Sequence, residues 1–127
     1  MNMPKIVISK QVLGRLDAML GTTGYDHLGK LGAYLLDELA RAQVVGDDEL
    51  PPQVVSMHRK VRFRDDAAGR ETEAVLVYPE ELGTVPHALS VLTPVGAALL
   101  GLSEGQSMGY QTPDGREKTL TVVKVFR

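Results

Sequence analysis

The three histidines are the residues of this chain best suited to bind a transition metal. They stand at His27, His58 and His87, so no two are four residues apart, and no acidic residue stands at ligand spacing from any of them. The chain also contains no cysteine, which excludes a disulfide framework, thiol chemistry and a cysteine-ligated metal. We therefore expect no metal site and no cofactor.

Motifs for nucleotide binding and for hydrolysis are missing. Gly96 and Gly101 belong to a short predicted helix and its end, and they do not form a phosphate loop or a dinucleotide fingerprint. No serine stands in a Gly-x-Ser-x-Gly elbow. Nothing in the sequence supports catalysis, so we expect a non-enzymatic protein.

Three cations alternate with two apolar residues in the middle of the chain. Lys60, Arg62 and Arg64 fall on one face of a predicted strand, whereas Val61 and Phe63 fall on the other. One interpretation is a solvated outer face on an edge strand, whose charges prevent aggregation. The other is an electrostatic contact with an acidic partner surface or an RNA end. The sequence leaves both open.

The segment 89–102 predicts a strand, a short helix and a stop. Thr93 is a favourable N-cap, Pro94 suits the first helical position, and Gly101 stands where helices end in a left-handed residue. One face of the helix is apolar, through Val95, Ala98, Leu99 and Leu102. We expect this helix to be buried against a sheet.

Two antiparallel helices are predicted before it. Ser9 is a plausible N-cap for the first, and Gly21 to Gly24 interrupt the pattern before a second helix that begins near Leu28. Their apolar faces comprise Val12, Leu13, Leu16, Met19 and Leu20, then Leu31, Leu35, Leu39 and Ala42. Asp26 is the only acidic residue between Gly21 and Leu28, and we interpret it as the N-cap of the second helix in preference to a catalytic ligand.

A polar, acidic segment with two prolines, Gly46 to Pro52, divides the chain. We place a helical hairpin at residues 1–46 and a globular domain at residues 47–127. Strands are predicted over residues 54–56, 61–64, 71–78, 89–92, 106–112 and 118–126, with turns at 65–69 and at Pro113-Asp114-Gly115. The fold class is therefore α+β, with a twisted, mainly antiparallel sheet on one short helix.

Composition restricts the partners. The formal net charge is −2, which disfavours binding to nucleic acid through bulk electrostatics. No apolar run approaches the ~20 residues that cross a bilayer, and the N-terminus lacks the apolar run of a signal peptide. We expect a cytoplasmic monomer without membrane contact, which meets nucleic acid only through a protein complex.

The segment from Leu89 to Leu102 resembles the C-terminal domain of the Gre transcript-cleavage factors. Over nearly its whole length the chain is similar to their short relatives, the regulators of nucleoside diphosphate kinase, most specifically at residues 37–43 and 90–102. The resemblance implies an FKBP-like arrangement for residues 47–127 and a short coiled coil for residues 1–46.

The resemblance also implies a partner, RNA polymerase. In Gre factors the loop before the short helix contacts the polymerase coiled coil at the mouth of the secondary channel, which gives Thr93 and Pro94, with their neighbours Leu92 and Val95, a docking role. Capping and helix initiation alone would equally explain Thr93 and Pro94. Leu92 stands where some Gre members carry a polar or acidic residue, so an apolar contact would replace a charged one.

Gre factors stimulate RNA cleavage with acidic residues at the tip of a long hairpin. Here a helix of about twelve residues spans only ~18 Å, and Asp26 is alone where two carboxylates would be needed to hold a second metal. We therefore expect docking without cleavage. Direct binding to nucleoside diphosphate kinase is the alternative. A prolyl isomerase is disfavoured, because the chain has no Trp and only two Phe, Phe63 and Phe126, to line such a pocket.

Overall fold

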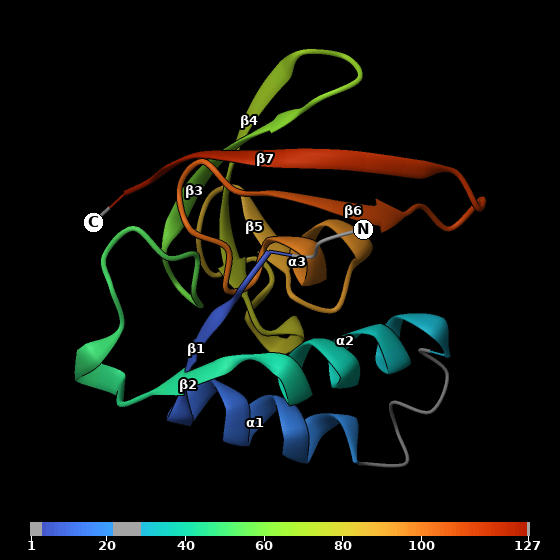
Figure 1. The fold of residues 1–127 in the computed structure, drawn as a ribbon. Helices are drawn as coiled ribbons and strands as arrows, with labels where there is room; N and C mark the ends of the chain where they lie inside the picture. The colour runs from blue at the N-terminus through green and yellow to red at the C-terminus, as the bar shows by residue number, and fades with distance from the viewer. Residues whose placement is uncertain (1–3, 22–28, 127) are drawn as a thin grey trace.

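The computed structural model describes residues 4–21 and 29–126, which form three α-helices, two short 3₁₀ turns and two sheets (Figure 1). In chain order the elements are β1 Val7–Ser9, α1 Lys10–Leu20, α2 Lys30–Arg41, β2 Gln43–Val45, η2 Asp47–Glu49, β3 Lys60–Asp65, β4 Arg70–Val77, η3 Pro79–Glu81, β5 Ala88–Ser90, α3 Pro94–Leu99, β6 Ser107–Gln111 and β7 Glu117–Val125. In the described ranges none of these helices has the length and apolar character needed to span a bilayer.

The larger sheet has the strand order β5-β4-β3-β7-β6. Its pairs are antiparallel except for β4 and β5, so the predicted mainly antiparallel sheet is confirmed. The strand predicted over residues 61–64 is present, but the interpretation of its cations as the outer face of an edge strand is wrong, because β3 is bonded on one side to β4 and on the other to β7. The pairing with β7 joins residues about sixty positions apart, so no local sequence pattern could predict that β3 lies in the middle of the sheet.

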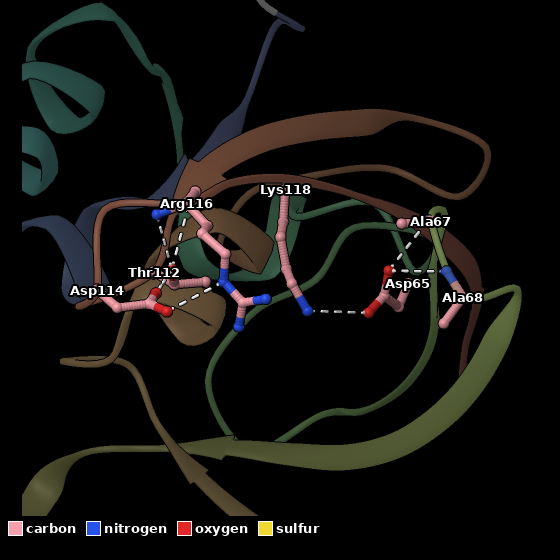
Figure 2. Close-up of polar contacts among 7 residues, drawn as sticks. All are labelled: Asp65, Ala67, Ala68, Thr112, Asp114, Arg116 and Lys118. Atoms are coloured by element: carbon pink, nitrogen blue, oxygen red, sulfur yellow. Dashed lines mark hydrogen bonds and ion pairs between the residues drawn. The ribbon is translucent and has the colours of Figure 1, made fainter.

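Both predicted turns are present and are closed by their own aspartates (Figure 2). At the β3–β4 turn the Asp65 carboxylate accepts hydrogen bonds from the backbone N–H of Ala67 and Ala68, at 3.1 and 3.3 Å. These bonds, that of Ala68 above all, hold the Asp65 pKa below its usual value. At the β6–β7 turn Asp114 accepts from the Thr112 hydroxyl and the Arg116 guanidinium. The Asp65 bonds form an Asx turn, and in both hairpins the contacts that close the turn come from residues within the turn itself.

Helices α1 and α2 lie side by side and run in opposite directions (Figure 1). The predicted N-cap of α1 is confirmed, because Ser9 Oγ accepts a hydrogen bond from the Val12 N–H at 3.3 Å. The prediction for α2 is wrong. Asp26 lies outside the described residues, and the N-cap position is taken by Gly29, whose φ of 52° a glycine adopts without strain. The coiled-coil description of this hairpin stays a prediction.

A two-stranded parallel sheet joins the base of the hairpin to the rest of the fold. β1 leads into α1, β2 follows α2, and the two strands pair from Val7↔Gln43 to Ser9↔Val45. The Val7 N–H also donates to the Gly101 carbonyl oxygen at 3.0 Å, just beyond α3. One core cluster therefore includes Ile6 and Ile8 as well as Leu99. The division at residue 46 stays a prediction, and this core crosses it.

Two predicted strands differ from the observed ones. Residues 54–56 form a single antiparallel bridge, Val54↔Ser103, because two prolines precede them and a turn follows. The strand predicted over residues 89–92 is observed as Ala88–Ser90. It ends there because Ser90 Oγ accepts a hydrogen bond from the Leu92 N–H at 3.0 Å, which turns the chain toward α3.

Candidate partner-binding surface

The loop from Ser90 to Thr93 satisfies its own polar groups. Thr93 Oγ1 donates to the Ser90 carbonyl oxygen at 2.7 Å and accepts from the Gly96 N–H at 3.0 Å. The predicted N-cap is thus confirmed, with Pro94 in the first turn of α3. Since these hydroxyl and amide groups are already paired within the loop, they are poorly placed to give hydrogen bonds to a partner.

Two glycines fix α3 in place. A Cβ on Gly96 would lie closer than 3.0 Å to the Ser90 carbonyl oxygen, a separation that real Cβ atoms essentially never show. Gly101 has a φ of 85°, as the sequence predicts, and a Cβ there would lie 2.8 Å from Ile6 Cβ. The backbones of the loop, α3 and β1 are therefore in direct contact. This close packing restricts the loop to a single conformation.

The outward part of this loop is apolar. Leu92, Pro94 and Val95 are each half-buried, and Leu92 and Val95 also pack against the core cluster. Their inner atoms are held by the core while the remainder faces solvent. We call Leu92, Thr93, Pro94 and Val95 the docking loop, after the role that the resemblance to Gre factors implies for them. Chemically it can offer a preformed apolar contact with few side-chain rotations left to lose.

Each cation of the row Lys60, Arg62 and Arg64 pairs with a carboxylate of the same molecule. Lys60 Nζ lies 3.0 Å and Arg62 Nη2 lies 2.6 Å from the Glu73 carboxylate, and Arg64 Nε lies 3.1 Å from Asp66. The hydrogen bonds from Arg62, and then those from Lys60, hold the Glu73 pKa below its usual value. The predicted alternation is confirmed on the opposite face, where Val61 is buried and Phe63 half-buried.

The structure separates the predicted site residues into two groups. The docking loop follows the edge strand β5, whereas the row Lys60, Arg62 and Arg64 lies on β3, with β4 between them. Asp26, the third predicted position, lies outside the described residues.

His58 and His87, the two histidines within the described residues, have different surroundings. His58 Nε2 lies 2.8 Å from Glu81 Oε1, His87 precedes β5 with a φ of 58°, and His27 lies outside the described residues. Within residues 4–21 and 29–126 no three acidic or histidine side chains are grouped to hold a metal ion. The Tyr78 N–H, and then His58, hold the Glu81 pKa below its usual value.

A further cluster that sequence reasoning missed joins α1 to η3. The Arg15 guanidinium lies over the Tyr78 ring at 3.7 Å from its centroid and pairs with Glu80. Burial raises the Tyr78 pKa. The partners are more than sixty residues apart in sequence, so no spacing could have signalled them. The cluster fastens the hairpin to the globular region.

Comparison with known proteins gives the family. Residues 50–127 match the family model of the transcription elongation factor GreA/GreB C-terminal domain. The regulator of nucleoside diphosphate kinase of Escherichia coli (strain K12) is 38% identical over 125 residues, covering 98% of this chain and 91% of that protein. The elongation factor GreA of Clostridium acetobutylicum is 33% identical over 86 residues, which are 68% of this chain and 54% of that protein.

A solved structure agrees with these sequence matches. The prokaryotic transcription elongation factor GreA/GreB from Nitrosomonas europaea superimposes with a TM-score of 0.73 at 39% identity, covering 98% of this chain and 99% of that one. The similarity thus extends through the hairpin as well as the sheet. The chain belongs to the family of the regulators of nucleoside diphosphate kinase, whose C-terminal domain is that of the GreA/GreB elongation factors.

Proposed function

We propose that this protein is a non-enzymatic regulator of transcription that binds RNA polymerase near the secondary channel. It competes there with Gre factors and does not stimulate transcript cleavage. It acts as a cytoplasmic monomer, with an FKBP-like C-terminal domain and a short coiled-coil hairpin. The observation that supports this proposal most directly is the docking loop, held rigid at the start of α3 in the domain that matches the Gre family.

The docking loop is suited to a protein surface. Its backbone is fixed by the Thr93 and Ser90 hydroxyls and by the close approach of Gly96 to the Ser90 carbonyl group. A loop that is ordered before binding loses little conformational entropy when a partner covers it. Leu92 and Pro94 then supply apolar area, at about 25 cal/mol for each Å² removed from water.

The size of the hairpin argues against transcript cleavage. α1 has 11 residues and α2 has 12, so each spans roughly 16 to 18 Å at 1.5 Å per residue. Between Gly21 and Leu28 the sequence supplies a single acid, Asp26. Placement of a second catalytic metal and its water calls for more than one carboxylate. The protein therefore occupies the site of a cleavage factor without its chemistry.

The cationic row gives a weaker second contact. Because Glu73 already pairs with both Lys60 and Arg62, replacing that partner by an acidic polymerase surface adds little net energy. The row contributes through long-range attraction, which changes the association rate and its salt dependence more than the affinity.

Direct binding to nucleoside diphosphate kinase is the second candidate. It rests on the 38% identity, over nearly the full chain, with a protein named as a regulator of that enzyme. A regulator that works through transcription would change the amount of kinase, whereas a direct one would change its activity in a purified mixture. The two candidates therefore predict different results with purified components.

The deciding experiment uses the full chain, fluorescently labelled, with core RNA polymerase and with purified nucleoside diphosphate kinase in parallel. We expect saturable binding to the polymerase that unlabelled GreA displaces, and no change in kinase activity. Binding to the kinase alone would replace the first proposal by the second. In the same preparation, arrested elongation complexes should remain uncut. New 3′ RNA fragments that disappear on Asp26→Ala would contradict the absence of cleavage.

A further inference from the structure

A groove of about 620 Å³ lies where β3 begins, away from the docking loop. Lys60, the first residue of β3, pairs with Val75 of β4, and Val75 in turn pairs with Ala88 of β5. On the other side of β3 the Phe126 N–H donates to the Lys60 carbonyl oxygen at 2.8 Å. The groove thus lies at one end of the sheet, where β3 and β4 meet the segment that precedes β5 and the residue that follows β7.

The walls of the groove are apolar and partly exposed. They include Val75, Val85, Pro86 and the ring of Phe126. Val85 is 39% exposed, which is a high fraction for an aliphatic side chain. Apolar walls of this kind gain free energy when a partner side chain fills them.

Cations line the groove and lie beside it. Lys60, Lys124 and Arg62 surround the Phe126 ring, with their charged groups 5.1, 4.9 and 5.5 Å from its centroid. Arg59, which lines the groove, donates through Nη1 to the carbonyl oxygens of Pro51 and Val54.

These four cations exceed the carboxylates near them. Glu73 pairs with Lys60 and Arg62, but among residues 4–21 and 29–126 no carboxylate forms an ion pair with Arg59 or Lys124. A ligand that fits must therefore bring negative charge beside an apolar group. We propose that the groove binds a short acidic segment of a partner protein, with an aliphatic or proline side chain between its carboxylates.

A peptide fits these observations better than a nucleic acid. Cations already approach the ring of Phe126, so it is not a free platform for base stacking. The other wall residues, Val85 and Pro86 among them, are aliphatic, and the net charge of the chain is −2. Peptide recognition by an apolar groove with a charged rim needs neither stacking nor a broad basic face.

The groove is independent of the docking loop. Val85 and Pro86 precede β5, whereas Leu92 and Pro94 follow it, so the two surfaces lie at opposite ends of that strand. The proposal does not require polymerase binding. Lys60 and Arg62 also belong to the cationic row, so the variants that distinguish the two proposals are Lys124→Glu, outside that row, and Pro94→Ala, in the docking loop.

The test measures fluorescence anisotropy of a labelled peptide, Glu-Asp-Glu-Leu-Pro-Asp-Glu-Asp, with the full-length protein. We expect saturable binding below about 1 mM that weakens severalfold when salt rises from about 0.05 M to about 0.3 M. Lys124→Glu should weaken binding about tenfold, and Lys60→Gln should act in the same direction. Lys10→Glu, an equal change of charge on α1, is the matched control and should stay within about twofold of the parent.

Three results would overturn the proposal. The first is no saturable binding of the acidic peptide to the parent protein. The second is equal weakening by Lys124→Glu and Lys10→Glu, which would indicate attraction to overall charge only. The third is tighter binding of a labelled single-stranded RNA than of the peptide, which would assign the groove to nucleic acid. Circular dichroism of each variant confirms that it is folded, and Lys60→Gln provides the result if Lys124→Glu does not fold.

Discussion

Helices α1 and α3 each contain an internal glycine, and the two glycines have opposite surroundings. A Cβ on Gly14 of α1 would meet nothing within 4 Å, whereas a Cβ on Gly96 of α3 would collide with the Ser90 carbonyl group. In α1 the glycine only lowers helix propensity. In α3 it permits the approach of two backbones. The comparison shows that α3 is positioned by its surroundings and that the outer face of α1 is free to change.

Gly96→Ala should give the largest effect. The added methyl group must displace the backbone of Ser90 and, with it, the Thr93 cap, so we expect the free energy of unfolding to fall by about 3 kcal/mol or more. Urea denaturation followed by circular dichroism measures the change. A loss below about 1 kcal/mol would mean that the loop can move, and would contradict the rigid docking loop.

Gly101→Ala should be the next most damaging change. Alanine is strained at a φ of 85°, and its Cβ would press on Ile6, so a loss of about 2 to 3 kcal/mol is expected. The same denaturation experiment applies. Because this contact joins α3 to the strand before α1, an unchanged stability would show that the core does not continue across residue 46.

Pro94→Ala separates the fold from docking. Alanine is a good helix former at this position, so stability should change by about 1 kcal/mol or less. If the proline ring is covered by the polymerase, affinity should fall about tenfold. Melting temperature and polymerase binding are measured on one preparation, with Pro113→Ala in the β6–β7 turn as the control. An unchanged affinity would leave Pro94 as a helix initiator alone.

Gly14→Ala tests the other side of the comparison. The position is open, so alanine should raise the free energy of unfolding by roughly 0.5 to 1 kcal/mol through helix propensity. Thermal and urea unfolding both measure it. Destabilisation would mean that a partner segment covers this face of α1.

Glu81→Gln should give the smallest effect, confined to acid pH. The Glu81 pKa is lowered in the fold, first by the Tyr78 N–H and then by His58, so its contribution is present above the unfolded pKa and is lost as pH falls through the folded pKa. The melting temperature of the parent should therefore fall more steeply than that of Glu81→Gln between about pH 5 and about pH 3. Parallel curves would contradict this assignment.

Local chemistry made much of the fold predictable. Ser9 and Thr93 mark the starts of their helices, because the side-chain oxygen of each accepts a hydrogen bond from the backbone N–H three residues later. Asp65 marks its turn by accepting from the backbone N–H groups of Ala67 and Ala68, and Asp114 marks its turn by pairing with the side chains of Thr112 and Arg116. Each of these signals lies within four residues of the structure that it determines.

The parts that could not be predicted depend on distant contacts. The central place of β3, the contact of Gly101 with Ile6 and the contact of Arg15 with Tyr78 join segments that are far apart in the chain. The same holds for the site. The docking loop follows from a local motif, whereas the groove combines Val85, Lys60 and Phe126 from three strand ends. Alternation correctly gave the faces of β3 but could not reveal that Glu73 pairs with both Lys60 and Arg62.

The parallel pair β1 and β2 has a consequence for how such proteins diversify. Both helices of the hairpin start or end at this pair, and their other ends point away from the sheet (Figure 1). Matched insertions of whole helical turns after Leu20 and before Lys30 would therefore lengthen the hairpin while the base, the core and the docking loop keep their contacts. The paired strands hold the base of the hairpin in one place. Hairpin length can therefore change, in evolution or by design, independently of the docking loop.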